Sequence, residues 1–239
     1  PVVTLGRQLR DVTADATGIL DEANDPPCLF IRSGDLARVT SDEHGRPIIG
    51  AVGTDELRHR LAEVATFVHV GEEGERDADP PVALAQNILA AWSWPFPPLL
   101  GVVEAPCIRP NGSIITSAGY DPETRLYHVP ADGLHVPKVP EAPTATQIAT
   151  AVGMLLDLLS DFPFDSEASL ANTLGLMLTP ILRPAIAGPV PLALIDAPAP
   201  GTGKSLLGEV VAQIATGRPA PMVTAARDDD EWRKRITGL

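Results

Sequence analysis

The sequence predicts an α+β region followed by the start of an α/β domain. Short apolar runs bounded by turn residues fill positions 1–130. A stretch rich in proline follows at 131–143, and apolar residues at helical spacing dominate 144–239. We therefore expect an accessory α+β domain over 1–130, a Pro-rich linker over 131–143 and a second domain over 144–239.

The composition is that of a globular, acidic chain. Its 239 residues are 44% hydrophobic, and 18 Lys+Arg against 31 Asp+Glu give a net charge of -13. Phosphate contacts need clustered Lys and Arg, which argues against a nucleic-acid clamp formed by this chain alone. Cys28 and Cys107 lie far apart, which predicts neither a disulfide nor a Cys-based zinc site. No apolar run reaches the roughly 18 residues of a membrane helix, so we expect a cytoplasmic protein without a membrane partner.

Residues 1–70 are predicted to hold strands and one helix. The apolar run 28–32 pairs with 36–40 in a hairpin around Ser33-Gly34-Asp35. Thr54 is the predicted cap of the helix, because Asp55 and Glu56 follow in its first turn. Its expected apolar face is Leu57, Leu61, Val64 and Val68.

The next segments are a predicted charged loop over 71–79 and a helix that starts at Pro80-Pro81. The expected apolar stripe of that helix is Leu84, Ile88, Leu89 and Trp92. A second β region follows, with turns at 109–112 and 121–124 before the returning runs 113–116 and 125–129.

Beyond the predicted linker, helices dominate. Thr144-x-x-Gln147 is a capping box that opens one helix, and a second helix starts near Asp165-Ser166. A buried strand is predicted over 190–195 and a further helix over 205–215. The expected inward residues of the three helices are Ile148, Val152, Leu155, Leu156 and Leu159; Leu170, Leu174, Met177, Leu178 and Ile181; and Leu206, Val210, Val211 and Ile214.

A glycine-rich segment joins the predicted strand to the last of these helices. Gly201 and Gly203 permit backbone angles that a side chain would forbid, so N–H groups can gather around an anion. The start of the helix adds further N–H groups and a partial positive charge. Lys204 can reach the β- and γ-phosphates, and the Ser205 hydroxyl can ligate Mg²⁺. This order of strand, loop and helix predicts a phosphate-binding loop.

The predicted ligands are ATP and Mg²⁺, with Ser205 as the metal ligand. The pattern G-x-x-x-x-G-K-[ST] expects a glycine at position 198, where this chain has Pro198. We expect this proline to change the entry to the loop more than its phosphate contacts. The alternative is a Gly/Pro-rich turn before a surface helix. The predicted cofactor-binding residues are Pro200, Gly201, Thr202, Gly203, Lys204, Ser205 and Leu206.

The segment Pro198-Ala199-Pro200-Gly201-Thr202-Gly203-Lys204-Ser205 resembles the nucleotide loop of AAA+-type ATPases, which often read G-P-P-G-T-G-K-[ST]. The wider chain resembles phage- and mobile-element-type primase-helicases of bacteria. The stretches that carry this second resemblance are 8–13, 24–27, 104–113, 119–127 and 230–236. Of all these matches, only the phosphate loop is chemically specific.

The resemblance implies an α/β P-loop NTPase domain of the AAA+ or RecA-like type, in an ATP-driven helicase of DNA replication. It also implies a homo-oligomeric ring in the parent protein and DNA as a partner of other parts of that parent. The chain begins at Pro1, and we expect a fragment that ends before the acidic strand. Catalytic residues are then expected beyond Leu239, and this chain alone is not expected to hydrolyse ATP. The alternative is a regulatory AAA+ switch without helicase activity.

Several remaining features have a simple structural interpretation. Pro221–Ala225 is a predicted second strand, and 228–238 a helix whose acidic start and basic end suit its dipole. The acids 228–231 are interpreted as that helix start rather than a metal cluster, and the basic residues 233–235 as a solvated face rather than a DNA contact. The five histidines are expected at surface or half-buried positions, the cysteines in packing roles, and Trp92, Trp94 and Phe96 in an interdomain apolar patch rather than in base stacking.

Overall fold

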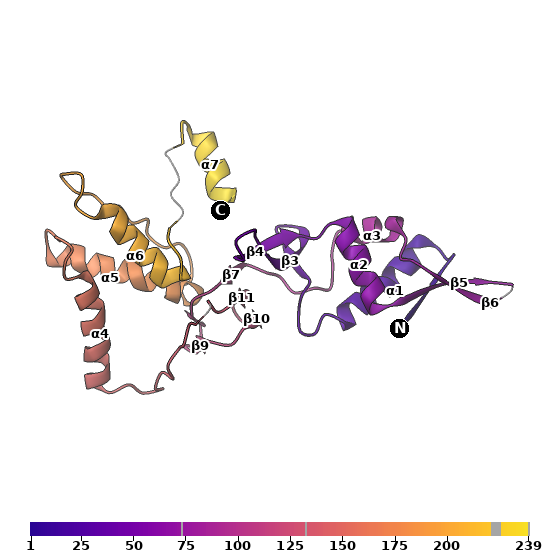
Figure 1. The fold of residues 1–239 in the computed structure, drawn as a ribbon, viewed down its shortest axis with the longest axis horizontal. Coiled ribbons are helices and arrows are strands. Elements are labelled where there is room, and N and C mark those ends of the chain that lie inside the picture. The colour runs from indigo at the N-terminus through magenta and orange to yellow at the C-terminus, as the bar shows by residue number, and fades with distance from the viewer. Residues whose placement is uncertain (73, 132, 221–225, 239) are drawn as a thin grey trace. The chain divides into compact units, whose positions relative to one another are not determined.

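The computed structural model describes residues 1–72, 74–131, 133–220 and 226–238, which divide into two units (Figure 1). Unit 1 comprises Pro1–Lys138 together with Ile181–Val190. Unit 2 comprises Val139–Pro180 together with Pro191–Leu239. The boundary at Lys138 falls inside the stretch that the sequence marks as a linker, whereas no sequence pattern indicates that 181–190 belongs to unit 1.

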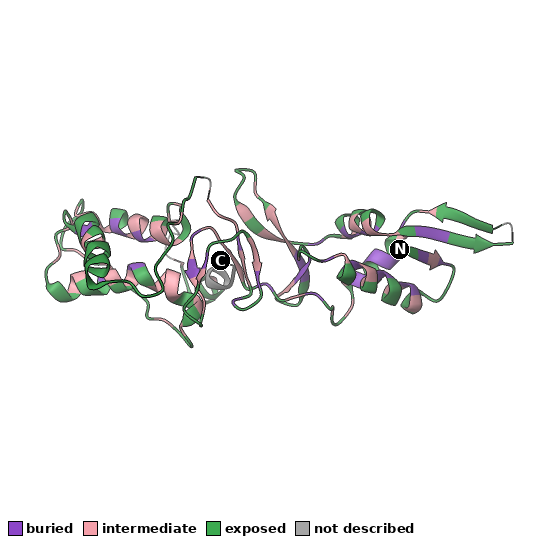
Figure 2. Cartoon of the chain, turned by 90° about the horizontal axis from the view of Figure 1, so that it is seen from below, coloured by how far each residue is buried: buried purple, intermediate pink, exposed green. Residues whose placement is uncertain are grey.

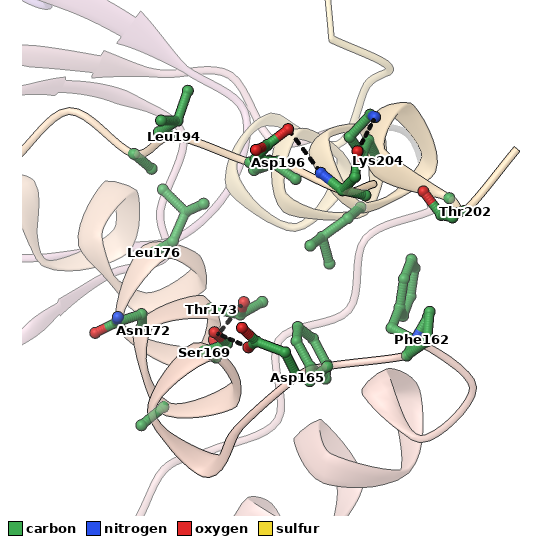
Figure 3. A pocket seen from close by; sticks show the side chains of 18 of the residues that line it. Phe162, Asp165, Ser169, Asn172, Thr173, Leu176, Leu194, Asp196, Thr202 and Lys204 are labelled. Atoms are coloured by element: carbon green, nitrogen blue, oxygen red, sulfur yellow. Dashed lines mark hydrogen bonds between the residues drawn. The ribbon is translucent and has the colours of Figure 1, made fainter. Parts of the chain in front are cut away.

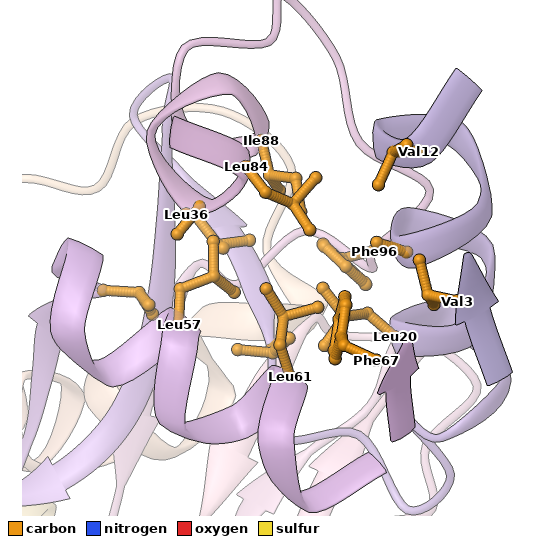
Figure 4. Close-up of a cluster of buried hydrophobic side chains, with 14 of the residues drawn as sticks. Val3, Val12, Leu20, Leu36, Leu57, Leu61, Phe67, Leu84, Ile88 and Phe96 are labelled. Atoms are coloured by element: carbon orange, nitrogen blue, oxygen red, sulfur yellow. The ribbon is translucent and has the colours of Figure 1, made fainter. Parts of the chain in front are cut away.

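The first half of unit 1 packs three helices beside a small sheet. These elements are β1 (Val2–Leu5), α1 (Leu9–Glu22), α2 (Thr54–Val64), β5 (Thr66–Gly71), β6 (Gly74–Ala78) and α3 (Val82–Leu89). The sheet order is β1-β5-β6, with β1 parallel to β5 and β6 antiparallel to β5. Residues four apart on α1, Val12, Ala16 and Leu20, are buried together with Leu57, Leu61 and Phe67 (Figure 4).

Four predictions for this region are wrong. Two helices, not one, precede residue 70, since α1 was not foreseen. The cap of α2 is Gly53, whose N–H donates to Glu56 Oε2 at 3.1 Å, and Thr54 is the first helical residue. That helix ends at Val64, so Val68 lies in β5. The charged segment 71–79 is largely strand β6, because an edge strand facing solvent can carry charged side chains on both faces.

The other half of unit 1 is built from short strands. A meander, β2 (Phe30–Arg32), β3 (Asp35–Ser41) and β4 (Pro47–Ala51), confirms the predicted hairpin. Ser33 and Gly34 have φ values of 53° and 91°, as a two-residue turn between twisted strands requires. The hairpin β8 (Cys107–Ile108) with β9 (Ile114–Ile115) and the pair β10 (Gly119–Asp121) with β11 (Leu126–His128) confirm both predicted turns. β11 also pairs in parallel with β7 (Gly101–Val103), and β8 contacts the short helix η1 (Arg183–Ala185).

Unit 2 is helical in its described residues. It contains α4 (Ala145–Leu159), α5 (Glu167–Leu182, of which the last two residues belong to unit 1), α6 (Lys204–Thr216) and α7 (Asp229–Gly238). The capping box is confirmed: Thr144 N donates to Gln147 Oε1 at 2.9 Å, and Gln147 N donates to Thr144 Oγ1 at 3.3 Å. The predicted last helix is also confirmed, with Glu231 N donating to Asp228 Oδ1 at 2.8 Å. The buried core is Leu159, Met177, Leu207 and Val211.

The predicted buried strand at 190–195 is wrong. No strand forms in this segment, and Leu192 and Leu194 are 98% and 91% exposed. Only Ile195 packs against the core of unit 2. A strand needs a neighbour to accept its backbone hydrogen bonds, and the described part of the chain supplies none here. The predicted second strand, 221–225, lies outside the described residues.

The apolar faces of the helices in unit 2 are only partly covered, as their green and pink colouring in Figure 2 shows. Ile148, Val152 and Leu156 of α4 are exposed although they were predicted to face inward, and so are Leu178 of α5 and Leu206 of α6. The apolar stripe therefore predicts which residues can be buried, while neighbouring elements decide which of them are. Among the described residues, no helix combines the length and the apolar character needed to cross a membrane.

Candidate functional site

Unit 2 contains a cavity of about 1080 Å³ beside the glycine-rich loop (Figure 3). One wall is the turn 162–165 with α5 residues between 169 and 179, and the opposite wall is the extended segment 191–198 with residues 202–204. Apolar side chains of Phe162, Leu176 and Leu207 line part of it. A volume of this size, with an apolar lining and a few convergent polar groups, is typical of small-molecule sites.

The loop adopts a conformation that depends on its glycines. Gly201 and Gly203 have φ values of 80° and 88°, in the left-handed region where a Cβ is disfavoured. Helix α6 begins directly after Gly203, whose carbonyl accepts from Leu207 N at 2.8 Å. The N–H groups in the first turn of a helix have no intrahelical acceptor and carry a partial positive charge. The end of the loop therefore offers an anion-binding helix start.

Lys204 brings the positive charge of the site into the cavity. Its side chain is half-buried, and Nζ donates to the carbonyl of Ala197 at 3.2 Å (Figure 3). The N–H of the same residue, Ala197, donates to Asp196 Oδ1 at 2.8 Å. A hydrogen bond to a neutral carbonyl is weaker than one to an anion. An anionic ligand in the cavity would therefore compete well with Ala197 for the ammonium group.

The turn that leads into helix α5 places a carboxylate on the other wall. Hydrogen bonds from Ser169 and Ser166 to Asp165 Oδ1, at 2.6 and 3.1 Å, hold the pKa of Asp165 below its ordinary value. The carboxylate therefore stays charged at neutral pH. Thr173 continues the polar row and donates to the carbonyl of Ser169 at 2.9 Å. The Lys204 wall also carries the Asp196 carboxylate, so an anionic ligand group is favoured at Lys204 itself and repelled near Asp165 and Asp196.

The structure brings some of the predicted site residues together and leaves others out of the cavity. Thr202, Gly203 and Lys204 line it, and Thr202 Oγ1 donates to the carbonyl of Ala199 at 3.1 Å. Ser205 is exposed in the first turn of α6, which leaves its hydroxyl accessible. Leu206 is 55% exposed on the next position. The residues that do not line this cavity are Pro200, Gly201, Ser205 and Leu206.

Sequence reasoning missed the α5 wall and the aromatic residue near Gly203. Position 165 just before α5 and positions 169, 172 and 173 on its polar side repeat at helical spacing, and all four line the cavity. Attention to that polar stripe would have found them, since the helix itself was predicted. Phe162 carries no comparable signal, because its position depends on how the turn between α4 and α5 approaches the loop.

The other candidate groups lie in unit 1 or form no cluster. Among the described residues, no group of three or more His, Cys, Asp or Glu could hold a metal ion. His128 is only 1% exposed, which corrects its predicted surface or half-buried position; its Nδ1 lies 3.0 Å from the Ser117 carbonyl, and Nε2 has no partner among the described residues. Cys107 is buried, which raises the pKa of its thiol, but Cys28 is exposed and does not fill the predicted packing role.

The tryptophan-rich segment is not the predicted interdomain patch. Phe96 is buried in the core of unit 1, and Trp94 packs against that core while its Nε1 donates to the Ile88 carbonyl at 2.8 Å. Trp92 lies beyond the end of α3 and is fully exposed. The predicted stripe of α3 therefore ends at Leu89. The side chains of 234 and 235 lie outside the described residues, so the interpretation of the basic run 233–235 stays a prediction.

Comparison with protein-family models, with curated proteins and with solved structures gave no match. The interpretation of the site therefore depends on its own residues and geometry.

Proposed function

We propose that unit 2 binds ATP with Mg²⁺ through the loop 200–206. One observation carries the proposal: two glycines with positive φ lead into the start of α6, where the Lys204 ammonium group enters a cavity of about 1080 Å³. Backbone N–H groups and a lysine at one wall suit a chain of phosphates. The remaining volume is sufficient for a base and a ribose.

The residues present fit the cation as well as the nucleotide. A hydroxyl group that follows the loop lysine is a suitable oxygen ligand for Mg²⁺, which takes few protein ligands and shares its shell with phosphates and water. Ser205 offers such a hydroxyl at an exposed position in the first turn of α6. When bound, the cation would neutralise phosphate charge, while the chain's own Lys204 and loop N–H groups would hold the phosphates.

We extend the proposal to the parent activity that the sequence resemblance implies: an ATP-driven DNA helicase or primase-helicase of a phage or mobile element. The support is the loop sequence and the family-like stretches named above, together with the loop geometry. DNA-stimulated ATP hydrolysis by a protein that carries this chain is the expected result. Turnover that DNA leaves unchanged would instead favour a regulatory ATPase switch.

The binding proposal can be tested by calorimetry with Mg–ATP on the chain and two lysine variants. Lys204→Ala should abolish binding, because the positive charge at the phosphate wall is lost. Lys138→Ala is the matched control, since Lys138 is exposed and outside the cavity. Circular dichroism should show the same helix content in all three proteins. Unchanged affinity in Lys204→Ala, or no binding by the unsubstituted chain, would refute the proposal.

A further inference from the structure

We propose that Phe162 is a positioning residue that holds the phosphate loop in its binding conformation through Gly203. The inference rests on the proposed nucleotide function and assigns to this side chain a role that no sequence motif indicates. It concerns the turn between α4 and α5, which lies some forty positions before the loop in the sequence.

The contact between the aromatic ring and the loop is close. A Cβ built on Gly203 would lie 3.4 Å from Phe162 Cε1 and 3.6 Å from Cδ1, so the edge of the ring occupies the space beside the Gly203 backbone. Gly203 has a φ of 88° at this point and directly precedes Lys204. The same comparison finds no atom within 4 Å of a Cβ at Gly201. Among the described residues, a side chain therefore lies within 4 Å of the Cβ position at Gly203 but not at Gly201.

The ring is itself held by the core of unit 2. Phe162 N donates to the Leu159 carbonyl at 3.1 Å, and Phe164 N donates to the Phe162 carbonyl at 2.9 Å. The ring lies 6.3 Å from that of Phe164, centroid to centroid, at an interplanar angle of 41°. Both rings pack against the buried cluster that contains Leu159 and Leu207. Phe162 therefore connects the buried core of unit 2 to the backbone of Gly203 at the end of the loop.

The physical reason for such support is the freedom of glycine. A glycine visits positive and negative φ about equally, so an unsupported Gly203 would sample conformations in which the N–H groups of the loop diverge. Fixing one residue before the ligand arrives removes an ordering cost from the binding step. Loss of the ring edge should therefore weaken binding of the phosphate chain itself by about tenfold.

A different role for the ring predicts a different result. Phe162 also lines the cavity, and an aromatic ring can stack on a nucleobase. Base stacking would affect ATP and leave a ligand without a base unchanged. Loop positioning affects both ligands equally, because it acts where the phosphates bind. Inorganic tripolyphosphate with Mg²⁺ is therefore the probe that separates the two roles.

The experiment measures the affinities of Mg–ATP and of Mg–tripolyphosphate by calorimetry for the full chain, Phe162→Leu, Phe162→Tyr and Leu174→Ala. Phe162→Leu keeps the apolar character but loses the ring edge, and should bind both ligands about tenfold more weakly. Phe162→Tyr keeps the ring and should retain affinity. Leu174→Ala removes packing from the same core at a residue that does not line the cavity, and should bind as the full chain does. Thermal unfolding of each variant reports on the fold.

Three outcomes would overturn the inference. A loss confined to Mg–ATP would make Phe162 a base contact. An equal loss in Leu174→Ala would indicate general loosening of the core. Unchanged affinities in Phe162→Leu would show that the loop needs no support from the ring. In each of these cases the full chain still binds and Lys204→Ala does not, so the proposed function survives; if the full chain binds neither ligand, both proposals fail.

Discussion

The conformation of the loop at Gly203 depends on the absence of a Cβ atom there. Its φ of 88° disfavours any L side chain, and a Cβ would also approach Phe162 to 3.4 Å. We predict that Gly203→Ala weakens Mg–ATP binding by about five- to thirtyfold, because a left-handed conformation costs an alanine about 1–2 kcal/mol. Calorimetry checks the affinity.

The control for this substitution lies in the helix that follows Gly203. Gly208 is in α6, and a Cβ there would meet no atom within 4 Å. Gly208→Ala should leave binding unchanged and raise the thermal stability of unit 2, since alanine is favoured over glycine inside a helix by roughly 1 kcal/mol. Equal affinities for Gly203→Ala and Gly208→Ala would contradict the assigned role of the loop conformation.

Asp121 is a buried carboxyl in unit 1 whose lowered pKa should give a pH-dependent stability. Burial alone raises the pKa of this carboxyl, but hydrogen bonds from Thr124 and Arg109 outweigh burial and leave the pKa below the ordinary value of 3.8. Arg109 Nε lies 2.7 Å from Oδ1, while Thr124 N and Oγ1 lie 3.0 and 2.7 Å from Oδ2. A lowered folded-state pKa gives stability that is complete above the ordinary value and is lost as the pH falls through the lowered one.

We therefore predict that Asp121→Asn costs unit 1 about 2 kcal/mol at pH 7, and that its difference from the unsubstituted chain shrinks below about pH 4. Chemical denaturation followed by the fluorescence of Trp92 and Trp94 measures this. Glu123→Gln is the control, because Glu123 is exposed on the same turn and its substitution should cost less than about 0.5 kcal/mol. A constant difference between Asp121→Asn and the unsubstituted chain from pH 7 to pH 3 would contradict the linkage.

Some residue roles at the candidate site follow from the local sequence, and others do not. The glycines, Lys204 and Ser205 occur as neighbours, so the sequence alone indicates their chemistry. The role of Phe162 and the burial of His128 depend on contacts between distant segments. No local pattern encodes such contacts.

At the scale of elements, segment 191–195 shows that apolar residues are not always buried. Leu192 and Leu194 are almost fully exposed, whereas Ile195 packs on the core. We predict that Leu192→Ser and Leu194→Ser each change the stability of unit 2 by less than about 0.5 kcal/mol. Leu159→Ala should cost about 2–5 kcal/mol, because Leu159 is buried in the core. Thermal unfolding followed by circular dichroism provides the comparison.

A loss in Leu192→Ser as large as that in Leu159→Ala would show that the segment is covered in solution.

The sequence predicts the helices here well, because caps and apolar spacing are local signals: Thr144 with Gln147 opens α4, and Asp165-Ser166 precedes α5. It predicts strands less well, because a strand is stabilised by its neighbours. The same limit explains why the sequence pattern predicts a loop where β6 forms, and a strand over 190–195 where none forms.

At the scale of the whole molecule, the chain passes between the two units more than once. Unit 1 ends at Lys138, but Ile181–Val190 belongs to it as well, with η1 in contact with β8. We predict that a protease site inserted at 139–143 allows cleavage while residues 1–138 stay associated with the remainder. Size-exclusion chromatography of the cut protein without denaturant should give one peak, and in denaturant two. Separation without denaturant would show that 181–190 does not hold to unit 1.

Because 181–190 belongs to unit 1, it also determines when unit 1 becomes complete during protein synthesis. A chain emerges from the ribosome from its N-terminus at about 5–20 residues per second. The first 138 residues can collapse early, but unit 1 lacks its last segment until position 190 has emerged. The whole of α4 and of α5 is translated in that interval, so the helices that precede the glycine-rich loop are synthesised while unit 1 is still incomplete. Unit 1 is therefore completed only after helices of unit 2 have been synthesised.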